Sequence, residues 1–271
     1  MHIHTFASDG LMTPEDVVNQ ARSAGLSMIS VTDHDTVFNT AKLNTFCENC
    51  GLKSVAGVEI SAYEGDVKVH TLGYGFNPES PVLKEFLSGL RGGSERRAEE
   101  IVAKLNKNGV TVTYDEVSAE RISPITPIHS MHIAHAAVRK GYGKNRYKFY
   151  KTYLMAGRPA YSNICRPSPE ETIEVIKAAG GIAVIAHPGR VELNKTDLHT
   201  LILRLAAAGL EGIEAVYSTH TVLETAYFKE LAEERGLYVT GGSDTHFTGG
   251  NRSIGSPVFH PSAELRQRLK I

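Results

Sequence analysis

The chain has no tryptophan, only three cysteines among 271 residues, and no excess of charge of one sign. An odd number of cysteines does not form a disulfide framework, so we expect a reducing, cytoplasmic location. Cys47 and Cys50 form a C-x-x-C motif, but the second pair that a zinc ribbon requires is missing. The 29 basic and 30 acidic residues leave a net charge of -1, which argues against a strongly electropositive surface for nucleic acid.

Long apolar segments are also missing. No run approaches the roughly 20 residues that span a bilayer, and we expect no secretory signal. A content of 41% hydrophobic and 22% charged residues is typical of a globular protein, and 271 residues suffice for one large α/β domain or for a domain with an insertion. We therefore expect a small substrate, with no membrane and no obligate protein partner.

Short apolar runs that alternate with helical segments dominate both ends of the chain. The predicted strands are a short one at His2–His4 and runs at residues 27–31, 54–58, 67–74, 182–186, 212–217 and 237–240. Strands that alternate with helices pack in parallel, and right-handed crossovers curl them into a (β/α) barrel. Because His2 follows Met1 directly, the first strand is unusually short, and we expect residues to be missing upstream.

The middle of the chain breaks this rhythm, because it lacks strand-like runs. Four helices are predicted there, at residues 82–90, 95–107, 126–140 and 144–155. We therefore predict a discontinuous barrel domain of residues 1–76 and 164–271. Residues 77–163 are predicted to form a helical insertion on one side of the substrate site.

Histidine and carboxylate side chains recur near the C-terminal ends of the predicted strands, where barrels carry their chemistry. The candidate metal ligands are His2, His4, Asp9, His34, Glu59, His70, His187, Asp244 and His246. Six histidines and three carboxylates are too many donors for one ion and suit two or three divalent ions. The set contains no thiolate, which favours manganese, iron or zinc. Such ions activate water and hold phosphoryl oxygens, so the set predicts metal-assisted phosphoester hydrolysis.

Five motifs in order along the chain resemble those of the polymerase and histidinol phosphatase (PHP) family, within the amidohydrolase-like superfamily. They are His2-Ile3-His4-Thr5 with Ser8-Asp9-Gly10, Thr32-Asp33-His34-Asp35, Gly57-Val58-Glu59-Ile60-Ser61, Ala186-His187-Pro188, and Gly242-Ser243-Asp244-Thr245-His246. The resemblance covers nearly the whole chain and implies a distorted (β/α)7 barrel with a trinuclear metal centre.

The resemblance also implies how the ligands are shared among three ions. One ion would be held by His2, His4, Glu59 and Asp244, a second by Glu59, His70 and His187, and a third by Asp9, His34 and His246. Glu59 would bridge the first two ions. Glu59 and Asp244 are thus the predicted catalytic organisers of the centre.

The insertion resembles that of small PHP phosphoesterases acting on nucleotide phosphates, most closely around His132 and Arg158. Relatives carry an Arg-Pro pair before the histidine equivalent to His132, whereas this chain has Ser130-Met131. We therefore expect different contacts with the substrate, which include those that would suit a cyclic phosphodiester of a sugar.

Further candidates lie outside the nine ligands. His220 at a strand end is predicted as a general acid, with a plain loop histidine as the alternative. Arg96 and Arg97 near an expected helix start, and Arg190 three residues after His187, are predicted substrate-binding residues together with His132 and Arg158. Asp33 and Asp35 are predicted to orient the neighbouring histidine.

One basic run could track a nucleic-acid backbone, but a solvated helix face is the expected reading because no aromatic pattern accompanies it. The run comprises Arg139, Lys140, Lys144, Arg146, Lys148 and Lys151.

The sequence thus predicts a metal-dependent phosphoesterase for a nucleotide or sugar phosphate. A cyclic sugar-phosphate phosphodiesterase and a 5′-3′ exonuclease on short oligonucleotides are the alternatives among enzymes. A catalytically silent metal-binding scaffold is the alternative of another class.

Overall fold

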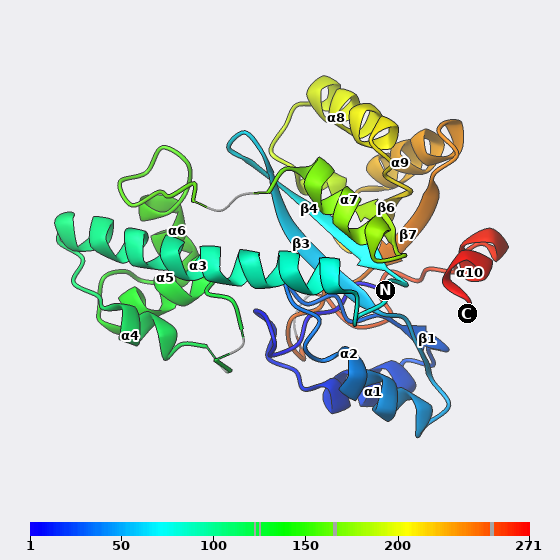
Figure 1. Ribbon diagram of the computed structural model, residues 1–271, viewed down its shortest axis with the longest axis horizontal. Helices are drawn as coiled ribbons and strands as arrows, with labels where there is room; N and C mark the ends of the chain where they lie inside the picture. The colour runs from blue at the N-terminus through cyan, green and yellow to red at the C-terminus, as the bar shows by residue number, and fades with distance from the viewer. Residues whose placement is uncertain (122, 125, 165–166, 250–251) are drawn as a thin grey trace. The chain divides into compact units, whose positions relative to one another are not determined.

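The computed structural model describes residues 1–121, 123–124, 126–164, 167–249 and 252–271 and has a mixed α/β fold. It divides into two compact units (Figure 1). Unit 1 comprises Met1–Glu85 and Pro167–Ile271, and unit 2 comprises Phe86–Arg166. Unit 2 starts later than the predicted insertion because the first turn of its longest helix belongs to unit 1.

Unit 1 contains every strand that the structure describes. The strands are β1 (Met28–Ile29), β2 (Lys53–Ser54), β3 (Gly57–Glu64), β4 (Val67–Tyr74), β5 (Ile182–Ile185), β6 (Gly212–Tyr217) and β7 (Tyr238–Gly242). Its helices are α1 (Pro14–Ser23), α2 (Thr40–Glu48), α7 (Pro169–Ala178), α8 (Lys195–Ala207), α9 (Val222–Glu234) and α10 (Ala263–Leu269), with a 3-10 turn η1 (Pro188–Arg190). The helices α7 and α9 pack against the strands β4 and β6, respectively.

The larger sheet has the order β3-β4-β5-β6-β7, and β1 pairs with β2 in a small parallel sheet. Strands β5, β6 and β7 run parallel, as predicted. The prediction of parallel packing is wrong for β4, which is antiparallel to both β3 and β5. Only Gly65 and Asp66 separate β3 from β4, and a parallel crossover needs a dozen or more residues. The two strands therefore form a hairpin.

Backbone hydrogen bonds link β7 to β3 through the N-terminal segment. The amide of Asp244 donates to the carbonyl of His2 at 2.8 Å, and the amide of Thr32 donates to the carbonyl of Ile3 at 2.9 Å. The amide of Asp35 then donates to the carbonyl of Glu59 in β3 at 2.9 Å. The predicted strand at His2–His4 is reduced to a single bridge between Ile3 and Thr245. These bonds bring the ends of several strands to one place.

Local sequence signals explain where the helices of unit 1 begin. Thr13 and Ser168 are N-caps with complete capping boxes, each followed by proline at the first helical position. The buried faces of α1 and α2 pack in an apolar cluster around Ile3, Val17 and Leu43. A second cluster around Leu72, Val184 and Leu265 lies against the larger sheet. The two clusters fix the strands whose ends carry the polar side chains described below.

Unit 2 is helical in its described part. It contains most of α3 (Pro81–Lys107), α4 (Tyr114–Ser118), α5 (Ser130–Arg139) and α6 (Arg146–Tyr153) around a buried apolar cluster that includes Leu105, Ile133 and Phe149. The two helices predicted at 82–90 and 95–107 are one helix, because Gly92 and Gly93 remain helical. Arg96 and Arg97 therefore lie inside α3, not at a helix start, and the expected anion-binding amides are absent there.

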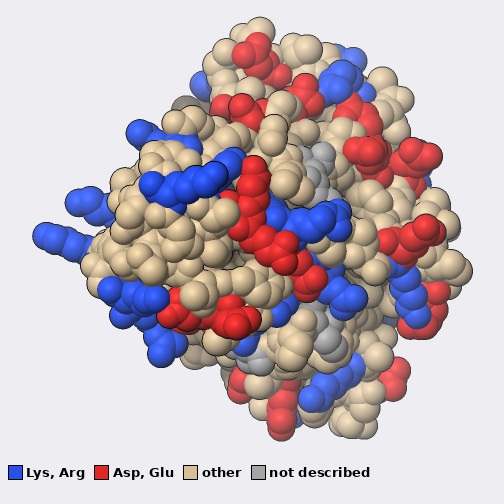
Figure 2. Space-filling model, turned by 60° about the vertical axis from the view of Figure 1, so that its left-hand side comes forward, with Lys and Arg blue, Asp and Glu red and all other residues tan. Residues whose placement is uncertain are grey.

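The two units differ sharply in charge. Unit 2 contains 14 Lys and Arg residues against six Asp and Glu, whereas unit 1 contains 15 against 24. On the face shown in Figure 2, basic side chains project from the left-hand edge. The near-neutral total therefore conceals a basic unit and an acidic one. In the part of the chain that the structure describes, no helix has the length and apolar character of a membrane span.

Candidate metal centre

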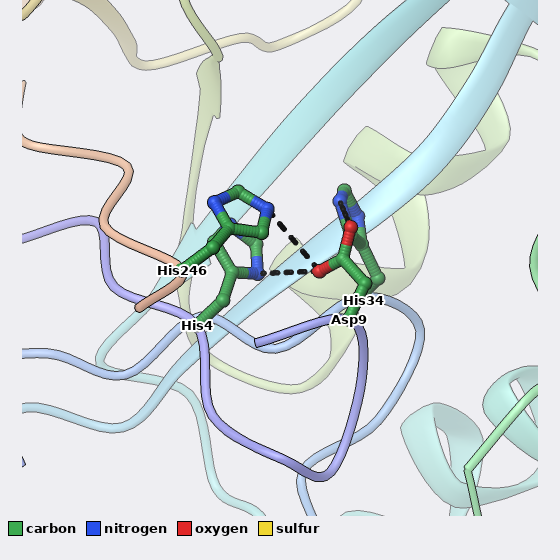
Figure 3. A group of neighbouring side chains, drawn as sticks. All are labelled: His4, Asp9, His34 and His246. Atoms are coloured by element: carbon green, nitrogen blue, oxygen red, sulfur yellow. Dashed lines mark ion pairs between the residues drawn. The ribbon is translucent and has the colours of Figure 1, made fainter. Parts of the chain in front are cut away.

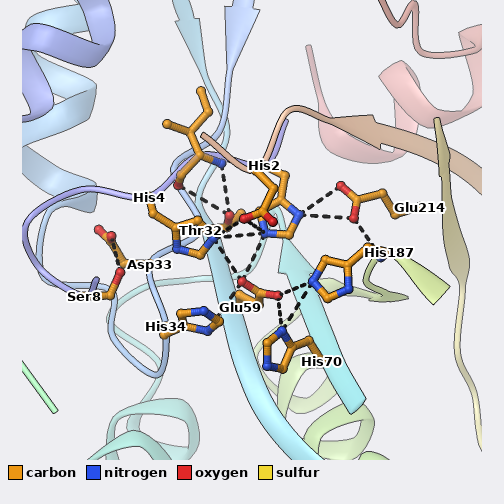
Figure 4. A network of polar contacts seen from close by, with 12 residues as sticks. His2, His4, Ser8, Thr32, Asp33, His34, Glu59, His70, His187 and Glu214 are labelled. Atoms are coloured by element: carbon orange, nitrogen blue, oxygen red, sulfur yellow. Dashed lines mark hydrogen bonds and ion pairs between the residues drawn. The ribbon is translucent and has the colours of Figure 1, made fainter. Parts of the chain in front are cut away.

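All nine predicted ligands lie in unit 1. They come from the N-terminal segment, from β3 and β4, and from the residues that follow β1, β5 and β7. Three overlapping groups of donors each have their ligand atoms within 4.8 Å of one another. The groups are His2, His4, Glu59 and Asp244; His4, Asp9, His34 and His246; and His34, Glu59 and His70. These groups contain eight of the nine predicted ligands. The ninth, His187, joins them through its Nε2, which lies 3.1 Å from Glu59 Oε1, so the donors form one continuous cluster (Figures 3 and 4).

The first group is fully buried and has a regular geometry. His2 Nε2 lies 3.1 Å from His4 Nε2, 3.0 Å from Glu59 Oε2 and 3.6 Å from Asp244 Oδ1. His4 Nε2 lies 3.1 Å from each of the two carboxylate oxygens. Four ligands placed tetrahedrally about 2.1 Å from an ion would be roughly 3.4 Å apart. The measured separations match that spacing.

Glu214 in β6 fixes the ring of His2 (Figure 4). Its carboxylate is fully buried and accepts a hydrogen bond from His2 Nδ1 at 2.9 Å and from the backbone amide of His187 at 2.8 Å. In the neutral form that binds a metal, Nδ1 would keep its proton for Glu214, and Nε2 would direct its lone pair at Glu59 and Asp244, which offer only lone pairs. A cation bound between these atoms would accept the lone pairs and remove the repulsion between them.

The second group is more open (Figure 3). Asp9 Oδ1 lies 3.2 Å from His246 Nε2 and 3.7 Å from His4 Nδ1, and Asp9 Oδ2 lies 3.9 Å from His34 Nε2. The side chains of Asp9 and His246 are 25% and 24% exposed, in contrast to the first group. This side of the cluster is therefore accessible to solvent.

Glu59 connects the groups through both carboxylate oxygens. Its Oε2 faces His2 and His4, whereas its Oε1 lies 2.6 Å from His70 Nδ1 and 3.1 Å from His187 Nε2. His70 Nδ1 and His187 Nε2 are 3.4 Å apart. The arrangement is that of a bridging carboxylate.

The electrostatics of the cluster favour positive charge. Burial opposes protonation of His2, but Glu214, Glu59 and Asp244 outweigh burial and raise the pKa of His2 to about 10. Burial likewise opposes ionisation of Glu59, yet His34, His70 and His2 hold its pKa well below its usual range. Three buried carboxylates that stay ionised create a field that a divalent cation also satisfies. The donors thus fit metal ions by spacing, by tautomer and by charge.

The second oxygen of Asp244 is held by residues that the sequence did not point to. Asp244 Oδ2 accepts a hydrogen bond from the Tyr217 hydroxyl at 2.6 Å and pairs closely with Arg252. Arg190 donates to the Tyr217 hydroxyl at 2.9 Å. These contacts leave Oδ1 alone to face the histidines. The sequence offered one signal for Arg252, which is a single arginine in the glycine-rich segment that follows the last motif.

Close backbone approaches bring the strand ends together. A Cβ on Gly242 would lie 2.2 Å from His2 Cβ, and a Cβ on Gly57 would lie 2.2 Å from Ser30 Oγ. His187 and Asp244 have positive φ values of 27° and 52°, which few non-glycine residues adopt. Strained backbone at two predicted ligands is typical of a functional site.

His220 is not free to donate a proton. Its Nδ1 donates to the carbonyl of Ala215 at 3.0 Å, and its Nε2 accepts from the amide of Gly189 at 3.1 Å. Burial lowers its pKa, so the ring is neutral at pH 7. In this arrangement His220 supports the turn after His187.

Asp33 and Asp35 bind backbone and hydroxyl groups beside the cluster. Asp33 accepts hydrogen bonds from the amide and hydroxyl of Thr5, at 2.7 and 2.6 Å, and from the Ser8 hydroxyl at 2.8 Å. Asp35 accepts from the amide of Ser61 at 2.9 Å. Both carboxylates orient the segments that carry the ligands.

Four of the five predicted substrate-binding residues lie in unit 2. Arg97 donates to the Ser130 hydroxyl at 3.4 Å, and His132 Nδ1 accepts from the amide of His129 at 3.1 Å. Arg96 and Arg158 are exposed. Arg190, the fifth, lies 3.6 Å from Asp244 and is the one that reaches the cluster within unit 1.

Comparison with known proteins identifies the family. The family model of the PHP domain matches residues 1–174. The chain belongs to the PHP domain family. The resemblance seen in the five motifs is therefore confirmed.

Relatives of this PHP-domain chain match it along most of their length. A 3′,5′-nucleoside bisphosphate phosphatase from Chromobacterium violaceum is 34% identical over 276 residues, which cover 99% of this chain and 96% of the relative. A 5′-3′ exoribonuclease from Haemophilus influenzae is 31% identical over 255 residues, or 94% and 92% of the two chains. The structure of an amidohydrolase from Chromobacterium violaceum, with bound sulfate and no metal, matches with a TM-score of 0.86 at 32% identity, over 99% of this chain and 94% of that one.

Proposed function

We propose that the chain is a metal-dependent phosphoesterase that hydrolyses small phosphorylated substrates such as nucleotides. The observation that carries the proposal is the convergence of His2 Nε2, His4 Nε2, Glu59 Oε2 and Asp244 Oδ1 at ligand spacing in a buried site. The relatives include a phosphatase of nucleoside bisphosphates, which supports a substrate of this class.

Two or three divalent ions of manganese, iron or zinc fit the donors. We assign the first to His2, His4, Glu59 and Asp244, the second to Glu59, His70 and His187, and the third to Asp9, His34 and His246. When bound, such ions lower the pKa of water and polarise phosphoryl oxygens. We also infer that unit 1 is a distorted (β/α)7 barrel, because hydrogen bonds join β7, the N-terminal segment and β3.

The side chains of this chain have separate tasks in the proposal. Glu59 bridges neighbouring positions through its two oxygens. Asp244 offers one oxygen while Tyr217 and Arg252 hold the other. Arg190, half exposed beside Asp244, is placed to bind the phosphate. Arg96, Arg97, His132 and Arg158 belong to unit 2, and their contacts with a substrate stay a prediction from the sequence.

A phosphate-release screen with added manganese tests the proposal. The substrates are nucleoside monophosphates, nucleoside bisphosphates, a cyclic sugar phosphate and short RNA. We expect release from nucleotides and loss of it after removal of the metal. A protein that holds stoichiometric divalent ions but releases no phosphate from any of these would be the silent metal-binding scaffold. A protein that binds no divalent ion would contradict the proposed centre.

One alternative within the enzymes is tested by the same panel. The exoribonuclease from Haemophilus influenzae supports a 5′-3′ exonuclease that trims short oligonucleotides. Stepwise release of mononucleotides from RNA, with little phosphate from free nucleotides, would favour that activity.

A further inference from the structure

The second half of unit 2 has an extreme charge distribution. Between Glu120 and Glu170 the sequence contains no Asp or Glu but has nine Lys and Arg residues. Four of these lie exposed in or just before α6, namely Lys144, Arg146, Lys148 and Lys151. We call these four side chains, together with Tyr147, the α6 surface.

Three carboxylates of unit 2 form ion pairs with cations outside the α6 surface. Glu116 pairs with Lys140 at 2.6 Å, Glu120 with Arg139 at 3.0 Å, and Glu100 with Lys104 at 2.8 Å. None of the four cations of the α6 surface forms an ion pair with a carboxylate of the described residues. Their charge therefore faces solvent uncompensated.

The helix dipole makes this placement unfavourable. Helices α1, α4 and α7 carry acidic residues in their first turns, where the dipole is positive. Helix α6, like α2, α3 and α5, has no acidic residue there, and it carries Arg146 and Lys148 in that turn. Cations at that end are disfavoured unless an anion binds to them. Among the residues that the structure describes, no ion pair of Arg146 or Lys148 offsets this cost.

An exposed aromatic ring accompanies the cations. Tyr147 is 60% exposed, whereas Phe149 on the same helix is buried in the apolar cluster. The Lys151 ammonium lies over the Tyr147 ring, 4.6 Å from its centre, so a cation covers one face of the ring. A base would stack on the other face. A ring that offers a face for stacking, set among cations, suits bases joined by phosphates.

We propose that the α6 surface binds single-stranded nucleic acid through its phosphates and stacks a base on Tyr147. This binding does not depend on the proposed hydrolysis, because none of the nine metal ligands takes part in it. An anionic membrane offers charge but no base, and Tyr147 is what distinguishes the two ligands.

The test measures the affinity of the purified protein, with its metal retained, for a fluorescent phosphorothioate dodecanucleotide that resists hydrolysis. We expect the triple variant Lys144→Gln, Lys148→Gln, Lys151→Gln to bind at least about tenfold more weakly at low salt. The slope of log affinity against log salt should become shallower by about 2, since each lost phosphate contact contributes about 0.7. Tyr147→Leu should weaken binding by about fivefold or more.

A matched triple variant of unit 1, Lys42→Gln, Lys53→Gln, Lys229→Gln, removes the same charge from exposed positions. It should bind as the wild type does, and replacement of the three α6 lysines by arginine should preserve binding. Equal loss in both triple variants, or an unchanged salt slope in the first, would overturn the proposal. Binding of the α6 surface to vesicles of anionic lipid with no effect of Tyr147→Leu on the oligonucleotide would also overturn it. Circular dichroism confirms that each variant is folded.

Discussion

The two units use charged side chains in opposite ways. In unit 1 the ionised groups that matter are buried, and each faces a partner of opposite character, as Glu59 does with His70 at 2.6 Å. In unit 2 the cations of the α6 surface are exposed and face solvent. A buried charge requires a partner at a fixed position, because burying it unpaired costs free energy. An exposed charge is solvated by water and remains free to bind a ligand from solution. The comparison teaches that the burial of a charged side chain decides whether it suits an ion held at a fixed position or a ligand that binds from solution.

The largest effect is expected from removal of the central charge of unit 1. Glu59→Gln keeps the size of the side chain but removes the negative charge between five histidines, so we expect loss of bound metal and a fall in phosphate release by roughly three orders of magnitude. Elemental analysis and the phosphate assay measure both. Glu64→Gln on the same strand, at an exposed position paired with Arg204, is the control and should retain both properties. Full metal content in Glu59→Gln would contradict the proposed centre.

A smaller effect is expected from the carboxylate behind the ligands. Glu214→Gln weakens the hydrogen bond that orients His2, and we expect metal affinity to fall roughly 10- to 100-fold. Titration with a competing chelator measures the affinity. Glu211→Gln, three residues earlier and paired with Arg268 at 3.6 Å, should leave it unchanged. If the two variants bind metal equally well, Glu214 has no positioning role.

Glycine substitutions compare the packing of the units. Gly57→Ala places a Cβ 2.2 Å from Ser30 Oγ and 2.5 Å from the Val31 carbonyl, so we expect a loss of about 1–3 kcal/mol in the free energy of unfolding. A Cβ at Gly89 in α3 meets no atom of the described residues within 4 Å, so Gly89→Ala should add about 0.5–1 kcal/mol to the free energy of unfolding. Urea denaturation gives both values. Equal effects would show that the strand ends in unit 1 are not tightly packed.

The smallest effect concerns an exposed pair in unit 2. Hydrogen bonds from Lys104 and Ser162 lower the pKa of Glu100 below its ordinary value of 4.5. A carboxyl group whose pKa is lower in the folded state stabilises the fold at pH values above its ordinary pKa. This stabilisation is lost as the pH falls through the lowered pKa. Because the pair is exposed, we expect Glu100→Gln to cost only a few tenths of a kcal/mol at neutral pH and nothing in acid. Urea denaturation at the two pH values measures this, and an equal cost at both would contradict it.

Glu59 and His70, which lie inside β3 and β4, were predictable because apolar residues directly precede them. His34, His187, Asp244 and His246 were predictable because they follow strands, and strand ends meet at one edge of a sheet. Glu214 was not, since it lies inside the strand Gly212–Tyr217, where an acid can equally face solvent. Only the three-dimensional pairing shows that its carboxylate meets His2. The same holds for Tyr217, whose hydroxyl contacts a ligand 27 residues further along.

The strand order was only partly predictable. Alternation of strands with helices correctly indicated the parallel arrangement of β5, β6 and β7. It failed at β4, although the two-residue link Gly65-Asp66 is itself a hairpin signal. The merging of two predicted helices into α3 has a different cause, because the cost of two glycines is modest beside the packing of a long helix.

The joining of the N-terminal segment to β7 has a consequence for biosynthesis. His2 precedes Asp244 by 242 residues in the chain, yet its carbonyl accepts a hydrogen bond from the Asp244 amide at 2.8 Å. Ligands so distant in sequence meet only when nearly the whole chain has been made, and such long-range closure is slow. The proposed metal site is therefore completed only late in folding, when the two ends of unit 1 have met.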